Sequence, residues 1–435
     1  MKRRWTSAES RRVTDKHSAQ NYNRYPAVAV ASKGAYFWDP EGNKILDLLS
    51  GYSAVLTHSW KFVIFALVRF LLNPRCCLDL VSNVIYSVPY AMFCEAITRF
   101  TEFDRVLAKS DGGSATESAA TALFLHAERR GIKKPKVVLI ENYFHGRGRS
   151  FTTNARFDVD QYKGKGPRSR GFIVVPRTIK AIRSVLARDD VIGIILEMHR
   201  GEGGPLFDHG EYREIIQIAR TLGKYVVLDG IQDCFYRCGD RLSFQEYDTE
   251  EHIYRPDAVV LGKALGGGLL PISALVGTDE FMSVFAPGTD GATFSGSPLQ
   301  CVVATAVIEY LEKHGDAIGK RSKEIGRRFA ENLKDIPHVD VEYRGSLIGL
   351  RIRGITSAES LCRRLLAGEY GQRIFMKHGH VYDDPHYGRI AHVRISPPIL
   401  AITDEMIDEA CRAIRVALLE ISAKIDAAQS WPIAA

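Results

Sequence analysis

Residues 211–229, "EYREIIQIARTLGKYVVLD", decide the fold class of this chain. The first fourteen residues place apolar side chains at helical spacing, and Gly223 near their end is typical of a helix terminus. The next five residues, "YVVLD", form a continuous apolar run that closes on a carboxylate. A helix followed at once by a strand that is apolar on both faces predicts a parallel sheet covered by helices.

The same alternation continues on both sides of this stretch. The sequence predicts a helix at 117–131 ("ESAATALFLHAERRG") and apolar strands at 136–140 ("KVVLI"), 169–176 ("SRGFIVVP"), 191–197 ("VIGIILE") and 257–263 ("DAVVLGK"). Such a pattern is typical of an α/β fold with a mostly parallel central sheet and helices on both faces.

The two ends of the chain have a different pattern. Two apolar runs around the turn "DPEGN" predict a hairpin over residues 34–53. Short strands and helices mix after about residue 325, as in "VDVEYRGSLIGLRI" (339–352). We therefore expect a large domain over residues 51–325 and a smaller α+β domain over 326–435, with the arm and hairpin of residues 1–50 packing on the smaller domain.

Composition is that of an ordinary globular protein, with 46% hydrophobic and 25% charged residues among 435. The net charge of +7 is spread along the chain without a module that alternates basic and aromatic residues, so nucleic-acid binding is not expected. The most apolar run, "FVIFALVRFLL" (62–72), is interrupted by Arg69 and is shorter than the roughly 20 residues of a membrane span. We expect a buried helix there, and no membrane partner.

The cysteines and the first residues bear on location. Eight cysteines in a chain of this length do not form a disulfide framework, and Cys234 and Cys238 lack the further ligands of a zinc site. The stretch "MKRRWTSAESRRVTDKH" (1–17) lacks the apolar run of a secretory signal. Reduced thiols, no metal and a cytoplasmic location are the expectation.

Three polar residues follow predicted parallel strands. Asp229 ends "YVVLD", Gln232 follows it by three residues, and Lys263 comes directly after "AVVLG". Ligands of open parallel sheets bind beyond the carboxyl ends of the strands, so we expect these side chains to converge on one crevice. For Lys263 alone, a lysine at a strand end that reaches out to water is the alternative to a desolvated, nucleophilic amine.

A lysine, a buried carboxylate and a phosphate-binding turn are together what pyridoxal phosphate (PLP) requires. The lysine forms the Schiff base, and the carboxylate keeps the pyridinium nitrogen protonated. The stretch "SDGGSATESAA" (110–120) supplies a glycine turn, the hydroxyl of Ser114 and a following helix start, where backbone N–H groups favour an anion.

These residues resemble the class III (ω-amino acid) PLP-dependent aminotransferases of fold type I, and within them the ornithine type. The resemblance covers nearly the whole chain, including the block "NYNRYPAVAVASKGAYFWDPEGNKILDLLSGYSAV" (21–55) and the blocks "ENYFHGR", "GEGG", "LDGIQDCF", "ATFSGSPL" and "HVRISPPI". It implies a transaminase that works on an amino donor and a 2-oxo acid acceptor.

The resemblance also implies roles around the cofactor. Lys263 would form the Schiff base and carry a proton, Asp229 would pair with the pyridinium nitrogen, and Gln232 would contact the ring hydroxyl. Phe144 would stack on the ring. The phosphate would be bound by Gly113 and Ser114, and by Thr293 of a second subunit, so that a homodimer with shared active sites is expected.

Five further residues match the substrate-binding positions of the ornithine type. Tyr22 and Arg147 would hold the far carboxylate, and Tyr52 would line the pocket. Glu202 would mask Arg394 while a terminal amine reacts, and would then release it to bind the α-carboxylate of glutamate or 2-oxoglutarate.

The chain departs from the family pattern around these positions. Gly230 replaces a glutamate, "QDC" replaces "QTG", and His145 stands where the ornithine type has a bulky aromatic residue. Transfer of a terminal amine, as from ornithine, to 2-oxoglutarate is the expected reaction. Racemisation or an intramolecular amine shift on the same cofactor, and a PLP-binding homologue that has lost catalysis, remain alternatives.

Overall fold

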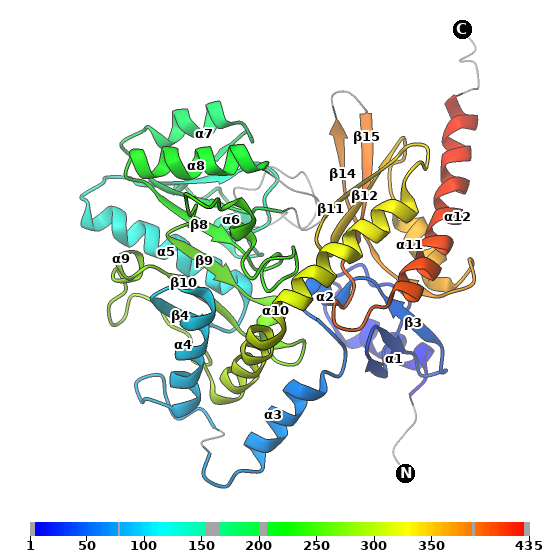
Figure 1. The fold of residues 1–435 in the computed structure, drawn as a ribbon, viewed down its shortest axis with the longest axis horizontal. Coiled ribbons are helices and arrows are strands. Elements are labelled where there is room, and N and C mark those ends of the chain that lie inside the picture. Colours follow the sequence, from blue (N-terminus) through cyan, green and yellow to red (C-terminus); the bar gives the residue numbers. More distant parts are fainter. Residues whose placement is uncertain (1–4, 77–78, 153–165, 200–206, 385–387, 430–435) are drawn as a thin grey trace. The chain divides into compact units, whose positions relative to one another are not determined.

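The computed structural model describes residues 5–76, 79–152, 166–199, 207–384 and 388–429 (Figure 1). The chain divides into two compact units, one built from residues 1–60 and 320–435 and the other from residues between 61 and 319. The borders fall at 60/61 and 319/320, where 50/51 and 325/326 were expected, and the second border lies inside the long helix α10 (Pro298–Leu333).

The unit of residues 61–319 contains a seven-stranded sheet with the order β4-β10-β9-β8-β7-β5-β6. Its strands are β4 (Arg105–Lys109), β5 (Lys136–Ile140), β6 (Phe172–Val175), β7 (Val191–Leu196), β8 (Tyr225–Asp229), β9 (Ala258–Leu261) and β10 (Ser273–Gly277). Neighbours from β6 to β9 pair in parallel, whereas β10 is antiparallel to both β9 and β4. The predicted α/β fold with a mostly parallel sheet is confirmed.

Both faces of this sheet are covered. Every residue of β7, β8 and β9 is buried, and successive strand residues point to opposite faces. The helical elements of the unit are α3 (Lys61–Leu71), α4 (Val88–Thr101), α5 (Gly112–Arg129), α6 (Arg149–Thr152), α7 (Ile179–Leu186), α8 (His209–Thr221), α9 (Asp279–Met282), the first part of α10, and the short 3₁₀ turns η2 (Ser243–Tyr247) and η3 (Lys263–Gly266).

The unit formed by the two chain ends has two smaller sheets, with orders β1-β2-β3-β13 and β11-β12-β15-β14. Their strands are β1 (Ala31–Lys33), β2 (Tyr36–Trp38), β3 (Lys44–Asp47), β11 (Val339–Arg344), β12 (Leu347–Arg353), β13 (Ile374–Phe375), β14 (Lys377–Asp384) and β15 (Gly388–Ile395). The helices are α1 (Ser7–His17), α2 (Ser50–Ser53), α11 (Glu359–Ala367) and α12 (Asp404–Gln429). The predicted hairpin is β2–β3, and β3 also pairs in parallel with β13 through Leu46 and Ile374.

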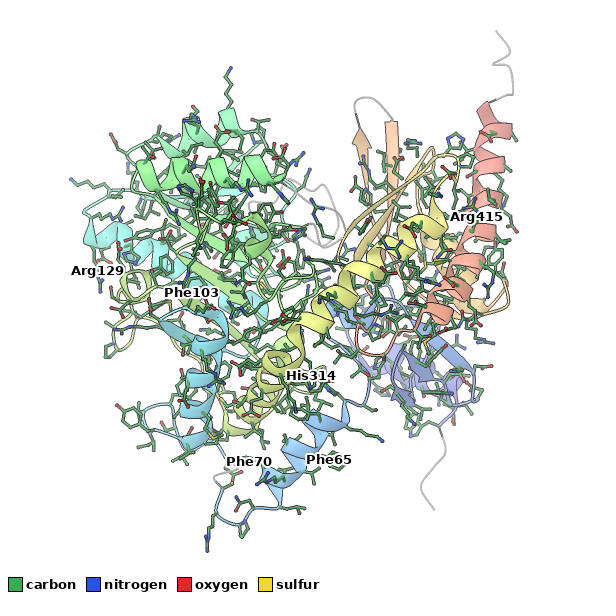
Figure 2. All side chains as sticks on the ribbon, in the orientation of Figure 1. Phe65, Phe70, Phe103, Arg129, His314 and Arg415 are labelled. Carbon is green, nitrogen blue, oxygen red and sulfur yellow. The ribbon has the colours of Figure 1, made fainter. Side chains whose placement is uncertain are left out.

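The prediction of a buried helix at residues 62–72 is wrong. Helix α3 forms there, but Val63 is the one residue of α3 that is fully buried, and the Phe65 side chain is 68% exposed (Figure 2). Apolar composition alone did not distinguish a helix inside the core from one that presents an apolar face at the surface. Within the described ranges, no helix is long and apolar enough to cross a membrane.

Candidate active site

Three neighbouring parallel strands deliver polar residues to one edge of the large sheet. Asp229 is the last residue of β8, Lys263 follows β9 by two residues, and Glu197 follows β7 directly. The amine of Lys263 donates a hydrogen bond to the side-chain oxygen of Gln232. The structure therefore brings Lys263, Asp229 and Gln232 to the same strand ends, where the sequence placed them.

The backbone at Lys263 is unusual. Lys263 has a φ of 46°, in the left-handed region that side-chain-bearing residues seldom adopt, and it opens the turn η3 directly after the strand. Such conformations persist where the surrounding structure holds them, and they are frequent at functional sites. The strain supports a functional role for this lysine over an exposed position in solvent.

A histidine that sequence reasoning did not place in the site contacts Asp229. The Nδ1 atom of His145 lies 2.8 Å from Oδ2 of Asp229, and both side chains are buried. The imidazole stacks on the ring of Tyr143, with centroids 4.9 Å apart and planes 17° apart. His145 thus fixes the carboxylate from one side, while the backbone N–H of Ile231 donates to its Oδ1 at 3.3 Å.

Glu197 is the second residue that sequence reasoning missed. Its Oε2 accepts the backbone N–H of Phe144 at 2.9 Å, which holds the loop that presents the partly exposed Phe144 ring. Burial, and next the negative charge of Asp229, raise the pKa of Glu197 well above its usual range. The apolar run that ends at Glu197 was the available signal.

Helix α5 begins at the predicted phosphate-binding turn. Asp111 caps the helix: its Oδ1 accepts the Ser114 N–H at 2.9 Å, and its Oδ2 accepts the Ser114 hydroxyl at 2.5 Å. The loop after β5 lies against this turn, because Thr116 donates to the carbonyl of His145 at 2.9 Å. A Cβ atom added at Gly146 would come within 2.8 Å of the Gly113 Cα.

The substrate-binding candidates, and Thr293 as a candidate for phosphate binding, are divided between the two units. Arg147 and Thr293 lie on exposed loops of the unit of residues 61–319. Tyr22, Tyr52 and Arg394 belong to the other unit, in which the Arg394 guanidinium lies 5.9 Å from the centre of the Tyr52 ring. The predicted switch residue Glu202 lies outside the described residues.

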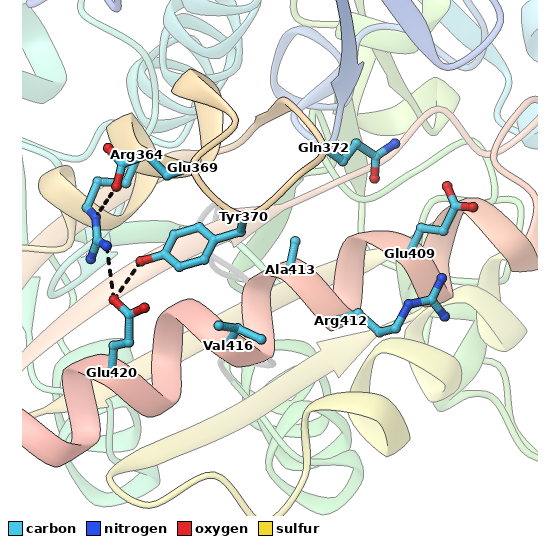
Figure 3. Close-up of a pocket in the computed structure, with 9 residues that line it drawn as sticks. All are labelled: Arg364, Glu369, Tyr370, Gln372, Glu409, Arg412, Ala413, Val416 and Glu420. Atoms are coloured by element: carbon cyan, nitrogen blue, oxygen red, sulfur yellow. Dashed lines mark hydrogen bonds and ion pairs between the residues drawn. The ribbon is translucent and has the colours of Figure 1, made fainter.

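A pocket of about 690 Å³ lies in the unit of the chain ends, between α12 and the segment that follows α11 (Figure 3). Arg364 is paired with Glu369 and Glu420, and the Tyr370 hydroxyl donates to Glu420 at 2.9 Å. None of the candidate catalytic residues lines this pocket. Its charges are largely satisfied internally, so it does not compete with the strand ends as the active site.

Comparison with known proteins identifies the family. Residues 17–418 match the family model for class III aminotransferases. The chain is a class III aminotransferase. It is 32% identical to an ornithine aminotransferase of an Exiguobacterium species over 414 residues, which cover 93% of this chain and 96% of the relative.

Solved structures agree with this family. An ornithine aminotransferase from Toxoplasma gondii, described with partial occupancy of PLP at its active site, matches with a TM-score of 0.84 and 28% identity and covers 97% of this aminotransferase and 96% of its own chain. An acetylornithine aminotransferase from Elizabethkingia anophelis matches with a TM-score of 0.78 and 27% identity over 96% of this chain and the whole of its own.

As a member of this family, the aminotransferase is a PLP-dependent transaminase that acts on amino and oxo acids. The residues at the strand ends fit the cofactor chemically. Lys263 offers an amine, the Asp229–His145 pair offers a carboxylate for a protonated ring nitrogen, and the start of α5 offers backbone N–H groups for a phosphate.

Proposed function

We propose that this aminotransferase transfers the terminal amino group of an amino acid such as ornithine to 2-oxoglutarate. The observation that carries the chemistry is the hydrogen bond between the Lys263 amine and Gln232. Gln232 lies in the loop that directly follows Asp229, and Asp229 is paired with His145. The choice of substrate is supported by the Exiguobacterium and Toxoplasma gondii relatives, both named ornithine aminotransferase.

Each polar residue at the strand ends has a task that its geometry supports. Lys263 would hold the cofactor through its amine and would carry a proton at its Nζ atom. Asp229 would hold a protonated ring nitrogen, and His145 fixes the Asp229 carboxylate at 2.8 Å. When bound, PLP supplies a conjugated ring that stabilises negative charge on the substrate carbon.

The neighbouring residues position the cofactor. Gln232 orients the Lys263 amine and would hold the ring hydroxyl, and Phe144, whose N–H is held by Glu197, would cover the ring face. Gly113 and Ser114 would hold the phosphate at the start of α5.

Substrate carboxylates are assigned to two arginines. Arg147 receives the far carboxylate of the donor, with Tyr22 as a candidate partner, and Arg394 receives the α-carboxylate of glutamate or 2-oxoglutarate. Planar guanidinium groups match carboxylates in a bidentate manner. The cation–π contact of Arg394 with Tyr52 supports a role for Tyr52 in holding that guanidinium, and Glu202 is the proposed switch partner.

We also propose that the active form is a homodimer in the cytoplasm. Helix α3 and the segment after it expose a run of large apolar side chains, here called the α3 face: Phe62, Phe65, Val68, Leu71, Leu72, Val84, Ile85 and Tyr86. Patches of this kind mark protein interfaces. Thr293 is exposed, as a residue that reaches a partner's phosphate must be, and the seven described cysteines are free.

A donor screen tests the proposed reaction. The PLP-loaded enzyme is mixed with ornithine, lysine, 4-aminobutyrate or glutamate, and conversion to the aminated form is followed by visible absorbance. We expect conversion by ornithine and glutamate, and multiple turnovers only when 2-oxoglutarate is present. Turnover of ornithine without any oxo acid would instead indicate a racemase or an aminomutase.

The variant that tests the role of Lys263 is Lys263→Ala. Its control is Lys180→Ala, on the exposed side of α7. Loss of the proposed proton carrier and covalent link is expected to lower kcat by at least about a thousandfold. Near-normal turnover by Lys263→Ala would overturn the assignment.

A further inference from the structure

A buried cluster of ionisable side chains lies beside the candidate active site and has no role in the scheme above. It contains His199 after β7, Asp233 and Cys238 in the loop after β8, and Glu246 in η2. The Nδ1 atom of His199 lies 2.9 Å from Oδ2 of Asp233 and 3.5 Å from the Cys238 sulfur. Its Nε2 atom lies 3.2 Å from Oε1 of Glu246.

The two carboxylates around His199 favour a positively charged imidazole. Both ring nitrogens of His199 face carboxylate oxygens, and only the doubly protonated ring presents a donor on each side. Burial by itself lowers the pKa of His199, but Cys238, Asp233 and Glu246 outweigh it and raise the pKa well above its usual range. These three are the titratable groups that face the ring, from the loop after β8 and from η2.

The cluster is joined to the catalytic residues through the chain. Asp233 directly follows Gln232, whose side-chain oxygen accepts the hydrogen bond from Lys263. The pKa of Glu197, raised by burial, is raised further by Asp229 and Asp233 and lowered by Lys263, so these charges act on a common region. No group of histidine, cysteine, aspartate and glutamate side chains in the described ranges has a metal-binding arrangement, which leaves a polar network as the interpretation.

We propose that His199 is a positioning residue for Lys263: its imidazolium fixes Asp233, and with it Gln232, and offsets the negative charge that Asp233 places one residue from the partner of the Lys263 amine. The proposal rests on the proposed role of Lys263 as the covalent link to PLP. The proposal also gives a function to Asp233, the aspartate of "QDC" that replaces the threonine of "QTG", because Asp233 has a buried cationic partner in His199.

The electrostatic part of the proposal predicts the direction in which the midpoint of a pH titration shifts. The visible absorbance of the PLP-loaded enzyme is titrated with pH, which reports the protonation of the Lys263–cofactor link. Removing the positive charge in His199→Gln should raise the midpoint by about half a unit to one unit. Removing the negative charge in Asp233→Asn should lower it by a similar amount, because Glu246 still keeps His199 protonated.

The double variant His199→Gln/Asp233→Asn should return the midpoint to near the wild-type value. The control is His338→Gln, since His338 is also paired with an aspartate, Asp426 at 2.7 Å, but belongs to the other unit. It should leave the midpoint unchanged. The proposal would be overturned if His199→Gln and Asp233→Asn both had the midpoint of the wild type, or if both shifted the midpoint in the same direction.

Two measurements separate this proposal from the proposed function. If the wild-type titration persists in Lys263→Ala, the covalent role of Lys263 is wrong. If Lys263→Ala abolishes it but the His199 and Asp233 variants do not move it, only the role of His199 is wrong. Should His199→Gln fail to fold, Asp233→Asn decides alone, and an unchanged midpoint in that variant contradicts the inference.

Discussion

Asp111 occupies, with its carboxylate, the helix end at which the phosphate of PLP is expected. The oxygens of Asp111 accept both the N–H and the hydroxyl of Ser114, one of the two residues assigned to the phosphate. A phosphate dianion that binds here has to displace a like charge from these donors. We therefore expect Asp111 to weaken cofactor binding while it stabilises the start of α5 in the cofactor-free protein.

Asp111→Ser keeps a capping side chain but removes the charge. We expect the dissociation constant of PLP to fall by about tenfold, equivalent to about 1.4 kcal/mol. Fluorescence titration of the cofactor-free protein measures it. Asp208→Ser, which makes the same exchange at the cap of α8, is the control and should bind PLP like the wild type. Weaker binding by Asp111→Ser would contradict this interpretation.

Among the site residues, those that directly follow predicted strands are easier to predict from the sequence than those that reach the site from distant segments. Lys263, Asp229 and Gln232 were located because the ends of parallel strands share an edge. His145 contacts the Asp229 carboxylate and Glu197 contacts the backbone N–H of Phe144, and these partners are 84 and 53 residues away in the sequence. No local pattern distinguishes such residues from ordinary buried polar side chains.

Among the elements, the loop after β5 closely approaches the start of α5, where we propose the phosphate site. Gly146 has a φ of 86°, and a side chain there would meet the backbone of Gly113. Both the conformation and the space exclude other residues. The loop and the helix therefore form one rigid cradle.

Gly146→Ala tests this cradle against a matched position. Gly131, at the other end of α5, has a φ of 68° and open space around it. Gly131→Ala should therefore lower the free energy of unfolding by about 1 kcal/mol, from the unfavourable backbone conformation and without a steric clash. Gly146→Ala should destabilise the protein by about 2–4 kcal/mol in urea unfolding and should also weaken PLP binding. Equal effects of the two changes would show that the close approach is unimportant.

Element type was predictable where apolar periodicity was strong, as in α5, α8 and the strands β5 to β9. Strand β10 was not predicted, because "SALVG" follows a glycine-rich turn and pairs antiparallel with β9 and β4, outside the helix–strand alternation. The exposed face of α3 was mistaken for core because a helix with an exposed apolar face and a core helix share the same composition.

For the whole molecule, the α3 face is the feature that a folded monomer leaves unexplained. We propose that a dimer buries it and also brings Thr293 of one subunit to the phosphate site of the other, because Asn83, next to the α3-face residue Val84, donates to the carbonyl of Ala292 at 2.7 Å. A substitution that prevents dimer formation would then also lower catalytic activity.

Phe65→Glu places a charge in the centre of the α3 face. We expect analytical ultracentrifugation to show a monomer, with kcat lowered at least about tenfold because the partner's contact with the phosphate is missing. Leu419→Glu on α12, which also replaces an exposed apolar side chain, should leave mass and activity unchanged. A fully active Phe65→Glu monomer would show that the active site is complete within one chain.

The parallel pairing of β3 with β13 has a consequence for synthesis on the ribosome. Leu46 leaves the exit tunnel early, but its partner Ile374 is added about 330 residues later. At roughly 5–20 residues per second, the first hairpin waits tens of seconds for its sheet to be completed. The seven-stranded sheet is complete in sequence by residue 277, so it can fold during that interval, before the sheet of the hairpin is complete.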